Sequence, residues 1–193
     1  MAAVCVYCAS STRVPESYVE LAAEVGTALA ARGHSLVSGG GRLSMMGAIA
    51  RAARAGGAHT VGVIPQALVD VEVGDTDGEL VVVGGMRERK GVMDARADAF
   101  LALPGGLGTF EELFEVLTWA QLGLHGKPIG VLNSAGFFDP LVAMIDRAIT
   151  DGFCREEHWR LFVVDDQPAR LMQRLREHQP PAVKKWIRSS DET

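Results

Sequence analysis

A glycine-rich stretch followed by two glutamates is the part of the sequence best suited to chemistry. It reads LPGGLGTFEE (residues 103–112) and joins an apolar run typical of a buried strand to a run with helical periodicity. Backbone N–H groups in such a turn are open to a ligand, and the dipole of the following helix favours an anion there. We therefore predict a phosphate-binding loop, with Glu111 or Glu112 as an acid or base at its edge.

A second glycine-rich turn lies earlier in the chain, where SGGGRLSMMG (residues 38–47) follows another short apolar run. It contains Gly39, Gly40 and Gly41, but neither a complete G-x-G-x-x-G dinucleotide motif nor a G-x-x-x-x-G-K-[ST] phosphate loop. Two interpretations remain equally open. The glycines either serve a tight turn with positive φ angles, or they form a second wall of the ligand pocket.

The charged stretch MRERK (residues 86–90) opens a predicted helix shortly before the strand that leads into the main glycine loop. Its periodicity alone favours a solvated helix face, because charged side chains mostly remain in water. The functional alternative is that one of these cations reaches the phosphate or a reacting sugar.

The three cysteines do not suggest a disulfide framework or a metal site. Their number is odd, and Cys5 and Cys8 form a C-x-x-C within an apolar strand, where residues three apart point to opposite faces. The five histidines show no metal-ligand spacing. We expect Cys5 and Cys8 to be small core residues, and we expect no bound metal.

The composition is typical of a globular enzyme or binding protein. The 193 residues are 48% hydrophobic and 22% charged, with a net charge of −5. A negative chain gives no general attraction for nucleic acid or anionic membranes, and no apolar run is long enough to span a bilayer. We expect one domain over residues 1–178 and a polar tail over residues 179–193. Without a recognisable signal peptide, a cytoplasmic location is expected.

Apolar runs alternate with amphipathic runs along the chain. Strands are expected over residues 3–9, 34–38, 60–64, 99–103, 128–132 and 161–164, and helices over residues 15–32, 48–57, 86–96, 109–122, 137–151 and 167–177. The acidic residues 66–78 are expected to form a solvated surface loop, followed by a short apolar run over residues 80–83.

This alternation predicts an α/β fold, a Rossmann-like doubly wound parallel β-sheet with helices on both faces. Ligands of such sheets bind beyond the carboxyl ends of the strands, where the strand order reverses. The serines after the first strand and both glycine-rich turns leave strands at that edge, so they should converge. On this ground Ser10, Gly39, Gly40 and Gly41 are candidate ligand-binding residues.

The main glycine loop resembles the PGGxGTxxE motif of the LOG (LONELY GUY) family, formerly described as lysine decarboxylases. The stretches MRERK (residues 86–90), TWAQLGLHGKP (residues 118–128) and CVYCASS (residues 5–11) are similar to that family as well. The likeness runs in one register from the first strand to about residue 162.

The resemblance implies a Rossmann-like homodimer, without a cofactor, that hydrolyses the N-glycosidic bond of cytokinin riboside 5′-monophosphates and of AMP. It implies Arg89 and Glu112 as catalytic residues, and Met46 is a further candidate for facing the base. One departure concerns base or ribose preference, because Gln66 or Ala67 stands where plant members carry a substrate-contacting glutamate. The substrate contacts that the resemblance implies are Lys90, Gly105, Gly106, Leu107, Gly108, Thr109, Phe110, Glu111 and Thr118.

N-glycosidic hydrolysis passes through an oxocarbenium-like sugar, so a carboxylate near the anomeric carbon is required. The residues alone divide this role between Glu111 and Glu112, either of which also simply suits a helix N-terminus. The motif selects Glu112 and leaves Glu111 for the ribose hydroxyls. Arg89 cannot readily release a proton, so its expected tasks are to orient Glu112, hold phosphate or ribose oxygens and polarise the leaving base.

Two other functions compete with hydrolysis. Molybdenum-cofactor carrier proteins share the fold and the glycine loop, but a pure carrier has no chemical need for the pair Arg89 and Glu112. A lysine decarboxylase needs pyridoxal phosphate on a lysine. The four lysines, Lys90, Lys127, Lys184 and Lys185, stand in no setting that the sequence marks as a Schiff-base site.

Overall fold

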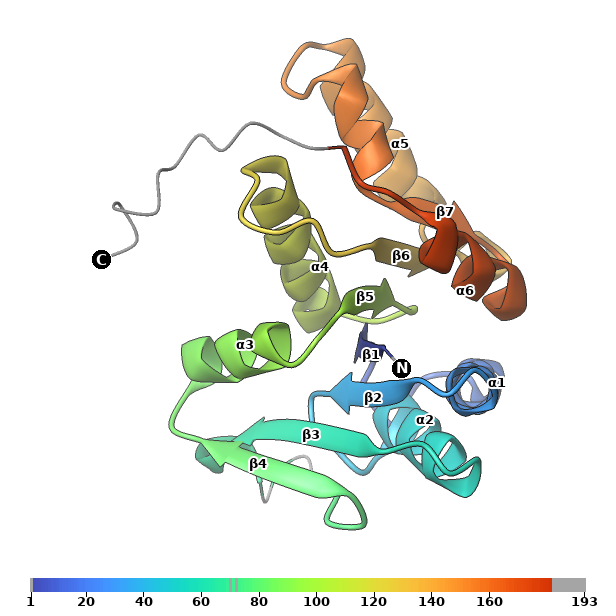
Figure 1. Ribbon diagram of the computed structural model, residues 1–193, viewed down its shortest axis with the longest axis vertical. Coiled ribbons are helices and arrows are strands. Elements are labelled where there is room, and N and C mark those ends of the chain that lie inside the picture. Colours follow the sequence, from blue (N-terminus) through green and yellow to red (C-terminus); the bar gives the residue numbers. More distant parts are fainter. Residues whose placement is uncertain (1, 70, 72, 182–193) are drawn as a thin grey trace.

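The computed structural model describes residues 2–69, 71 and 73–181, and it contains a sheet of seven parallel strands in the order β4-β3-β2-β1-β5-β6-β7 (Figure 1). This confirms the predicted parallel α/β sheet. The strands are β1 (Ala3–Tyr7), β2 (Ser35–Ser38), β3 (Thr60–Pro65), β4 (Glu79–Val83), β5 (Ala99–Ala102), β6 (Ile129–Leu132) and β7 (Val163–Asp165).

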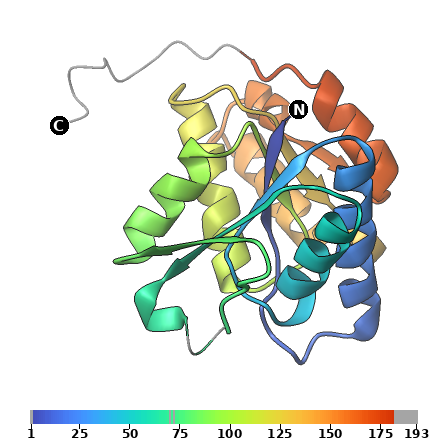
Figure 2. The same cartoon turned by 60° about the horizontal axis from the view of Figure 1, so that its bottom comes forward.

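Helices cover both faces of the sheet, because the strand residues are apolar on both sides. On β1, Val4 and Val6 pack with α1 (Glu16–Ala31), α2 (Ser44–Ala55) and α6 (Pro168–Glu177). Cys5 and Tyr7 face the opposite core, which contains residues of α3 (Met86–Ala95), α4 (Leu107–Gln121) and α5 (Asp139–Thr150). Figure 2 shows the sheet running between α3 and α4 on one side and α1 and α2 on the other. Single-turn 3₁₀ helices occupy Gln66–Leu68 and Ser134–Gly136, and a longer one occupies Glu156–Leu161.

The prediction was wrong about the strand count and about one residue of the surface loop over residues 66–78, whose other described residues are exposed or half-buried as expected. Six strands were predicted, and the structure has seven. The additional strand is β4, which contains residues 80–83 and lies at the edge of the sheet. Residues 80–83 are all apolar, but so short a run does not by itself distinguish a strand from a helical segment. The last strand is Val163–Asp165, since Leu161 still ends a 3₁₀ helix. Asp75 is buried and ion-paired rather than solvated.

Some expectations concern residues outside the part of the chain that the structure describes. These are Asp70 and Glu72 of the acidic stretch, and residues 182–193 of the polar tail, which include Lys184 and Lys185. Among the described helices, none combines the length and apolar character needed to cross a membrane.

The strand order reverses between β1 and β5, and this determines where a ligand can bind. Chain connections leave β1 towards β2 on one side, whereas β5 continues towards β6 on the other. Tyr7 and Ala102 are register partners at the ends of their strands, and the Leu103 amide donates a 2.9 Å hydrogen bond to the Tyr7 carbonyl. The segments that follow β1 and β5 therefore start side by side, at the crevice where doubly wound sheets bind ligands.

Candidate active site

A cavity of about 280 Å³ opens where β1 and β5 end. The segment after β1 contributes Ser10 and Ser11 to its wall, and the Ser11 carbonyl accepts a 2.6 Å hydrogen bond from Ser44 Oγ at the start of α2. The segments after three strands thus meet at one edge of the sheet. The lining residues are Cys8, Ala9, Ser10, Ser11, Met46, Met86, Arg89, Gly106, Leu107, Gly108, Thr109, Glu111 and Glu112.

The main glycine loop forms one wall of the cavity with the N-terminus of α4. The Phe110 amide donates to the Gly106 carbonyl at 3.1 Å, so the N–H groups of residues 107–109 precede the first helical hydrogen bond. A Cβ at Gly106 or Gly108 would meet no atom of the described residues within 4 Å. Packing does not explain these two glycines, but the absence of side chains leaves the backbone accessible to an anion.

Gly105 differs from Gly106 and Gly108, because it packs directly against Thr109. A Cβ at Gly105 would lie 2.2 Å from Thr109 Oγ1, so this glycine is required for the close approach of loop and helix. Thr109 is buried and lines the cavity. Gly105 therefore supports the loop from behind.

Arg89 is buried, although periodicity alone predicted that it lies on a solvated helix face. It is only 6% exposed, although it belongs to the charged stretch at the start of α3. Its Nε donates to the Val63 carbonyl and its Nη2 donates to the Gly39 carbonyl, both at 3.0 Å. The periodicity-based prediction of a wet face is wrong for this residue, because two distant carbonyls hold it at the cavity wall.

The two glutamates of the loop motif have different surroundings. Glu112 is half-buried and lines the cavity, whereas the Glu111 side chain is 54% exposed and its Oε1 lies 2.5 Å from Lys90 Nζ. Glu115 Oε1 lies 2.9 Å from the same Nζ. Burial alone would lower the pKa of Lys90, but the hydrogen bonds from Lys90 to both glutamates outweigh it and raise that pKa. Lys90 is therefore a charged ammonium paired with Glu111 and Glu115, and it does not itself line the cavity.

The second glycine-rich stretch (residues 38–47) lines the cavity through Met46, whereas its glycines at 39, 40 and 41 do not line it. Gly40 has a φ of +79°, which supports the tight-turn interpretation at this position. Gly41 forms an antiparallel bridge with Gly74. A Cβ at Gly39 would lie 2.0 Å from Arg89 Nη2 and 3.0 Å from Met46 Sδ. These glycines thus contact two cavity residues, Arg89 and Met46, without lining the cavity themselves.

Two further candidates, Phe110 and Thr118, lie outside the cavity. The Phe110 ring packs on Phe137 and Phe138, with centroids 6.3 Å away in each case. Thr118 is exposed, and its hydroxyl donates to the Phe114 carbonyl at 2.7 Å. Neither side chain reaches the cavity of this chain.

Four lining residues were not among the candidates: Cys8, Ala9, Ser11 and Met86. Three of them follow β1 at the carboxyl edge. The predicted strand extended to residue 9 and so included Cys8 and Ala9, whereas Ser11 stands directly after the candidate Ser10. Met86 is the first residue of α3, and its sulfur lies 3.8 Å from Arg89 Nη1. Met46 lines the cavity as expected from its position, while its neighbour Met45 is fully buried in the core.

Cys5 in β1 and Cys8 directly after it are confirmed as buried residues, and they pack in the two cores on opposite faces of the sheet. Burial raises the pKa of each thiol far above its usual range, and the negative charge of Glu112 adds to that effect. Although Cys8 lines the cavity, it is therefore a neutral thiol and not a nucleophile. Within the described residues, no group of three or more histidine, cysteine, aspartate or glutamate side chains could hold a metal ion.

This environment predicts a selective thiol reactivity. In the native protein at pH 8, a disulfide reagent such as Ellman's reagent should modify Cys154, which is half-buried, and leave Cys5 and Cys8 unmodified. All three should react after unfolding in guanidinium chloride. A Cys154→Ser variant supplies the control and should show almost no fast reaction, whereas rapid modification of Cys8 in that variant would contradict the assignment.

Comparison with known proteins identifies a matching family and several relatives of similar sequence. The model of the family described as "Possible lysine decarboxylase" matches residues 46–175. The chain is 50% identical over 178 residues to the "Probable cytokinin riboside 5′-monophosphate phosphoribohydrolase LOGL9" of Oryza sativa subsp. japonica, covering 92% of this chain and 78% of that protein. It is 44% identical to the "Cytokinin riboside 5′-monophosphate phosphoribohydrolase LOG7" of Arabidopsis thaliana, covering 92% and 82%.

Solved structures of lower identity share the fold. A Moco carrier protein from Chlamydomonas reinhardtii superposes with a TM-score of 0.69 at 19% identity, covering 91% of this chain and 96% of that one. A molybdenum cofactor binding protein from Rippkaea orientalis gives a TM-score of 0.67 at 19% identity, with 91% and 94% covered. At these identities the likeness concerns the fold alone.

Proposed function

Because the chain belongs to the LOG family of phosphoribohydrolases, we propose that it cleaves the N-glycosidic bond of cytokinin riboside 5′-monophosphates and of AMP. Water is the second substrate, and the products are the free base and ribose 5-phosphate. The observation that carries this proposal is the cavity that combines a helix N-terminus, the half-buried Glu112 and the buried Arg89.

In the proposed reaction, the 5′-phosphate lies against the amides of residues 107–109 at the N-terminus of α4. That arrangement holds an anion by hydrogen bonds and by the helix dipole, and it needs no excess of positive charge elsewhere. The open space in front of Gly106 and Gly108 supports this position, since nothing else in the loop fills it.

Glu112 is the proposed catalytic carboxylate. When the bond between the anomeric carbon and the base nitrogen breaks, its electron pair goes to the base and the sugar becomes oxocarbenium-like. The carboxylate stabilises that charge and takes a proton from the attacking water as the water oxygen bonds to the anomeric carbon. The departing base takes up one proton, and Glu112 returns its own to the solvent, so the protons balance. Arg89 keeps its proton and acts by charge, through the substrate oxygens or the departing base.

A decarboxylase with a pyridoxal phosphate Schiff base is not supported by the surroundings of the described lysines. Such a lysine must be able to lose its proton. Lys90 is paired with two glutamates, and Lys127 Nζ lies 2.7 Å from Asp94 Oδ1. The two glutamates raise the pKa of Lys90 and so favour its protonated form.

We further propose a cytoplasmic homodimer. The three cysteines are free thiols, which suits a reducing compartment. Leu107, which is 86% exposed, and Phe114 are seven residues apart on one stripe of α4, where Thr118 also lies. A second copy covering this stripe would bury the apolar side chains and bring Thr118 close to another chain. Analytical ultracentrifugation of wild type and Phe114→Glu tests the assembly.

The experiment that tests the activity compares isopentenyladenosine 5′-monophosphate, AMP and unphosphorylated isopentenyladenosine, with chromatography of the released base. Both monophosphates should give free base, whereas the riboside should react far more slowly because the loop has no phosphate to hold. The absence of base release from both monophosphates would refute the proposal. Release from the riboside at an equal rate would refute the phosphate site.

A further inference from the structure

The turn formed by residues 39–42 carries the Gly39 carbonyl that accepts the hydrogen bond from Arg89 Nη2. One side of this turn packs against β3 and β4. A Cβ at Gly40 would lie 3.2 Å from Ile64 Cβ and 3.2 Å from Leu80 Cδ1, so there is no free space on that side. The position of the Gly39 carbonyl therefore depends on what holds the turn from its other side.

The other side of the turn is held by residues 73–75, which we call the strap. The Arg42 amide donates to the Val73 carbonyl at 2.9 Å, and the Asp75 amide donates to the Gly40 carbonyl at 2.8 Å. Gly41 and Gly74 form the antiparallel bridge between these two hydrogen bonds. The strap and the turn thus form a short two-stranded contact.

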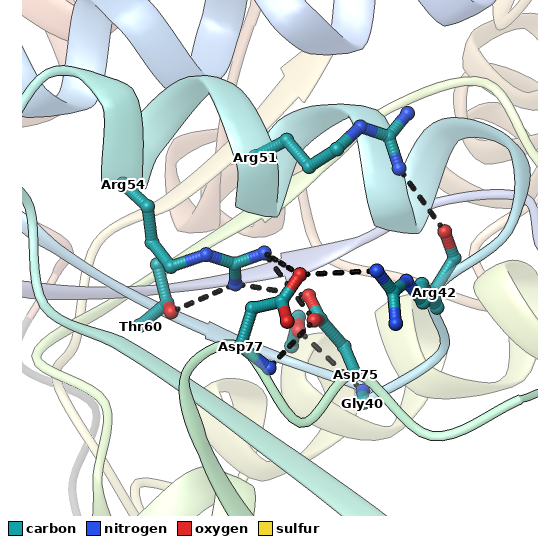
Figure 3. Close-up of polar contacts among 8 residues, drawn as sticks. Gly40, Arg42, Arg51, Arg54, Thr60, Asp75 and Asp77 are labelled. Atoms are coloured by element: carbon teal, nitrogen blue, oxygen red, sulfur yellow. Dashed lines mark hydrogen bonds and ion pairs between the residues drawn. The ribbon is translucent and has the colours of Figure 1, made fainter.

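An ion pair between Asp75 and Arg54 of α2 fixes the strap (Figure 3). Arg54 Nη1 lies 2.9 Å from Asp75 Oδ2 and Nη2 lies 3.2 Å from Oδ1, a two-pronged arrangement, and Nη1 also donates to Thr60 Oγ1 at 3.2 Å. The Asp75 side chain is only 6% exposed. Two charge-assisted hydrogen bonds that exclude water give a fixed geometry as well as attraction.

We propose that Arg54 and Asp75 are positioning residues for Arg89. The ion pair holds the strap, the strap holds the turn, and the turn sets the carbonyl that orients the Arg89 guanidinium. This inference rests on the proposed function, in which Arg89 acts on the bound nucleotide. Neither Arg54 nor Asp75 lines the cavity, so their effect on the reaction passes through Arg89.

The test is Asp75→Asn, which keeps the shape of the side chain and removes its charge. A displacement of about 1 Å in a reacting group can cost about a hundredfold in rate. Arg89 keeps its hydrogen bond to the Val63 carbonyl, so we expect a smaller displacement and a kcat for base release about tenfold lower. The KM for AMP should change by less than about twofold, as expected for a group that acts in the transition state. Asp77→Asn is the matched control. Asp77 is 51% exposed and lies 3.3 Å from Arg42 and 3.9 Å from Arg54, so this change removes a neighbouring, exposed charge and leaves the two-pronged pair intact. Because exposed ion pairs contribute little, it should leave kcat unchanged.

A double-mutant cycle with Arg89→Ala separates positioning from a general structural effect. If Asp75 acts through Arg89, adding Asp75→Asn to Arg89→Ala should lower kcat by less than about twofold, because the group to be positioned is gone. An equal loss in both backgrounds overturns the inference. An unchanged kcat in Asp75→Asn, or an equal loss in Asp77→Asn, overturns it as well.

Activity of the wild type is measured first, so that failure of the proposed function is recognised independently. If the wild type releases no base, the Nε–H signal of Arg89 in a nitrogen-15 NMR spectrum replaces kcat as the readout. Asp75→Asn should shift this signal and Asp77→Asn should not; an unshifted signal refutes the positioning. If Asp75→Asn does not fold, Arg54→Lys keeps the charge, loses the two-pronged geometry and takes its place, with the same outcomes.

Discussion

Replacing Glu112 with glutamine should lower kcat for base release by about two to four powers of ten, the usual contribution of general acid–base catalysis. Glutamine has the same shape, but it can neither accept a proton from water nor stabilise the sugar cation by charge. Glu112 is half-buried at the cavity wall, so the variant should fold normally. Steady-state release of adenine from AMP measures the loss, and circular dichroism checks the fold.

Glu111→Gln is the control for this experiment, because it makes the same change at the neighbouring position of the same helix. The Glu111 carboxylate is largely exposed and paired with Lys90, and Glu115 also pairs with that lysine. Losing one of two partners should mainly raise KM, by less than about tenfold, because the change weakens uniform binding. A larger kcat loss in Glu111→Gln than in Glu112→Gln would reverse the proposed roles.

Gly39→Ala should reduce kcat by about a hundredfold, since the added Cβ would displace the reacting arginine by an ångström or more. That Cβ would lie 2.0 Å from Arg89 Nη2 and 3.2 Å from Arg89 Cζ. Its close neighbours are the ends of flexible side chains rather than backbone, so the fold can accommodate the methyl group while Arg89 cannot stay in place. Thermal unfolding and kinetics on the same preparation measure both effects.

Gly91→Ala provides a matched control in α3, two residues beyond Arg89. A Cβ at Gly91 meets no described atom within 4 Å, and the residue is exposed. Alanine in a helix interior stabilises by about 0.5–1 kcal/mol relative to glycine, so this variant should be slightly more stable and fully active. Equal activity of Gly39→Ala and Gly91→Ala would show that the Gly39 contact does not govern Arg89.

The sheet was predictable because strand and helix signals alternate, and each buried strand is apolar on both faces. The edge strand β4 was not, since a run of only four apolar residues after an irregular acidic stretch does not by itself indicate a strand. The convergence of Ser10 with the main glycine loop followed from the rule that ligands bind at the carboxyl edge of such sheets.

The burial of Arg89 and of Asp75 was not predictable from periodicity. Both depend on contacts with residues far along the chain: Arg89 bonds to a carbonyl 50 residues earlier, and Asp75 bonds to Arg54, 21 residues earlier. The residues next to Arg89 or Asp75 in the sequence do not indicate such distant partners. The separate surroundings of Glu111 and Glu112 likewise appeared only once Lys90 and the cavity were located in space.

The acceptors of the Arg89 guanidinium at Val63 and Gly39 are main-chain atoms. A main-chain carbonyl remains when the side chain changes, so a substitution at Val63 keeps this acceptor. Gly39 has no such freedom, because any Cβ there would meet the Arg89 guanidinium. Met46 and Ser10, by contrast, line the cavity with side chains that mutation can change freely. Substrate preference can therefore drift, or be engineered, at those positions while the arginine keeps its orientation.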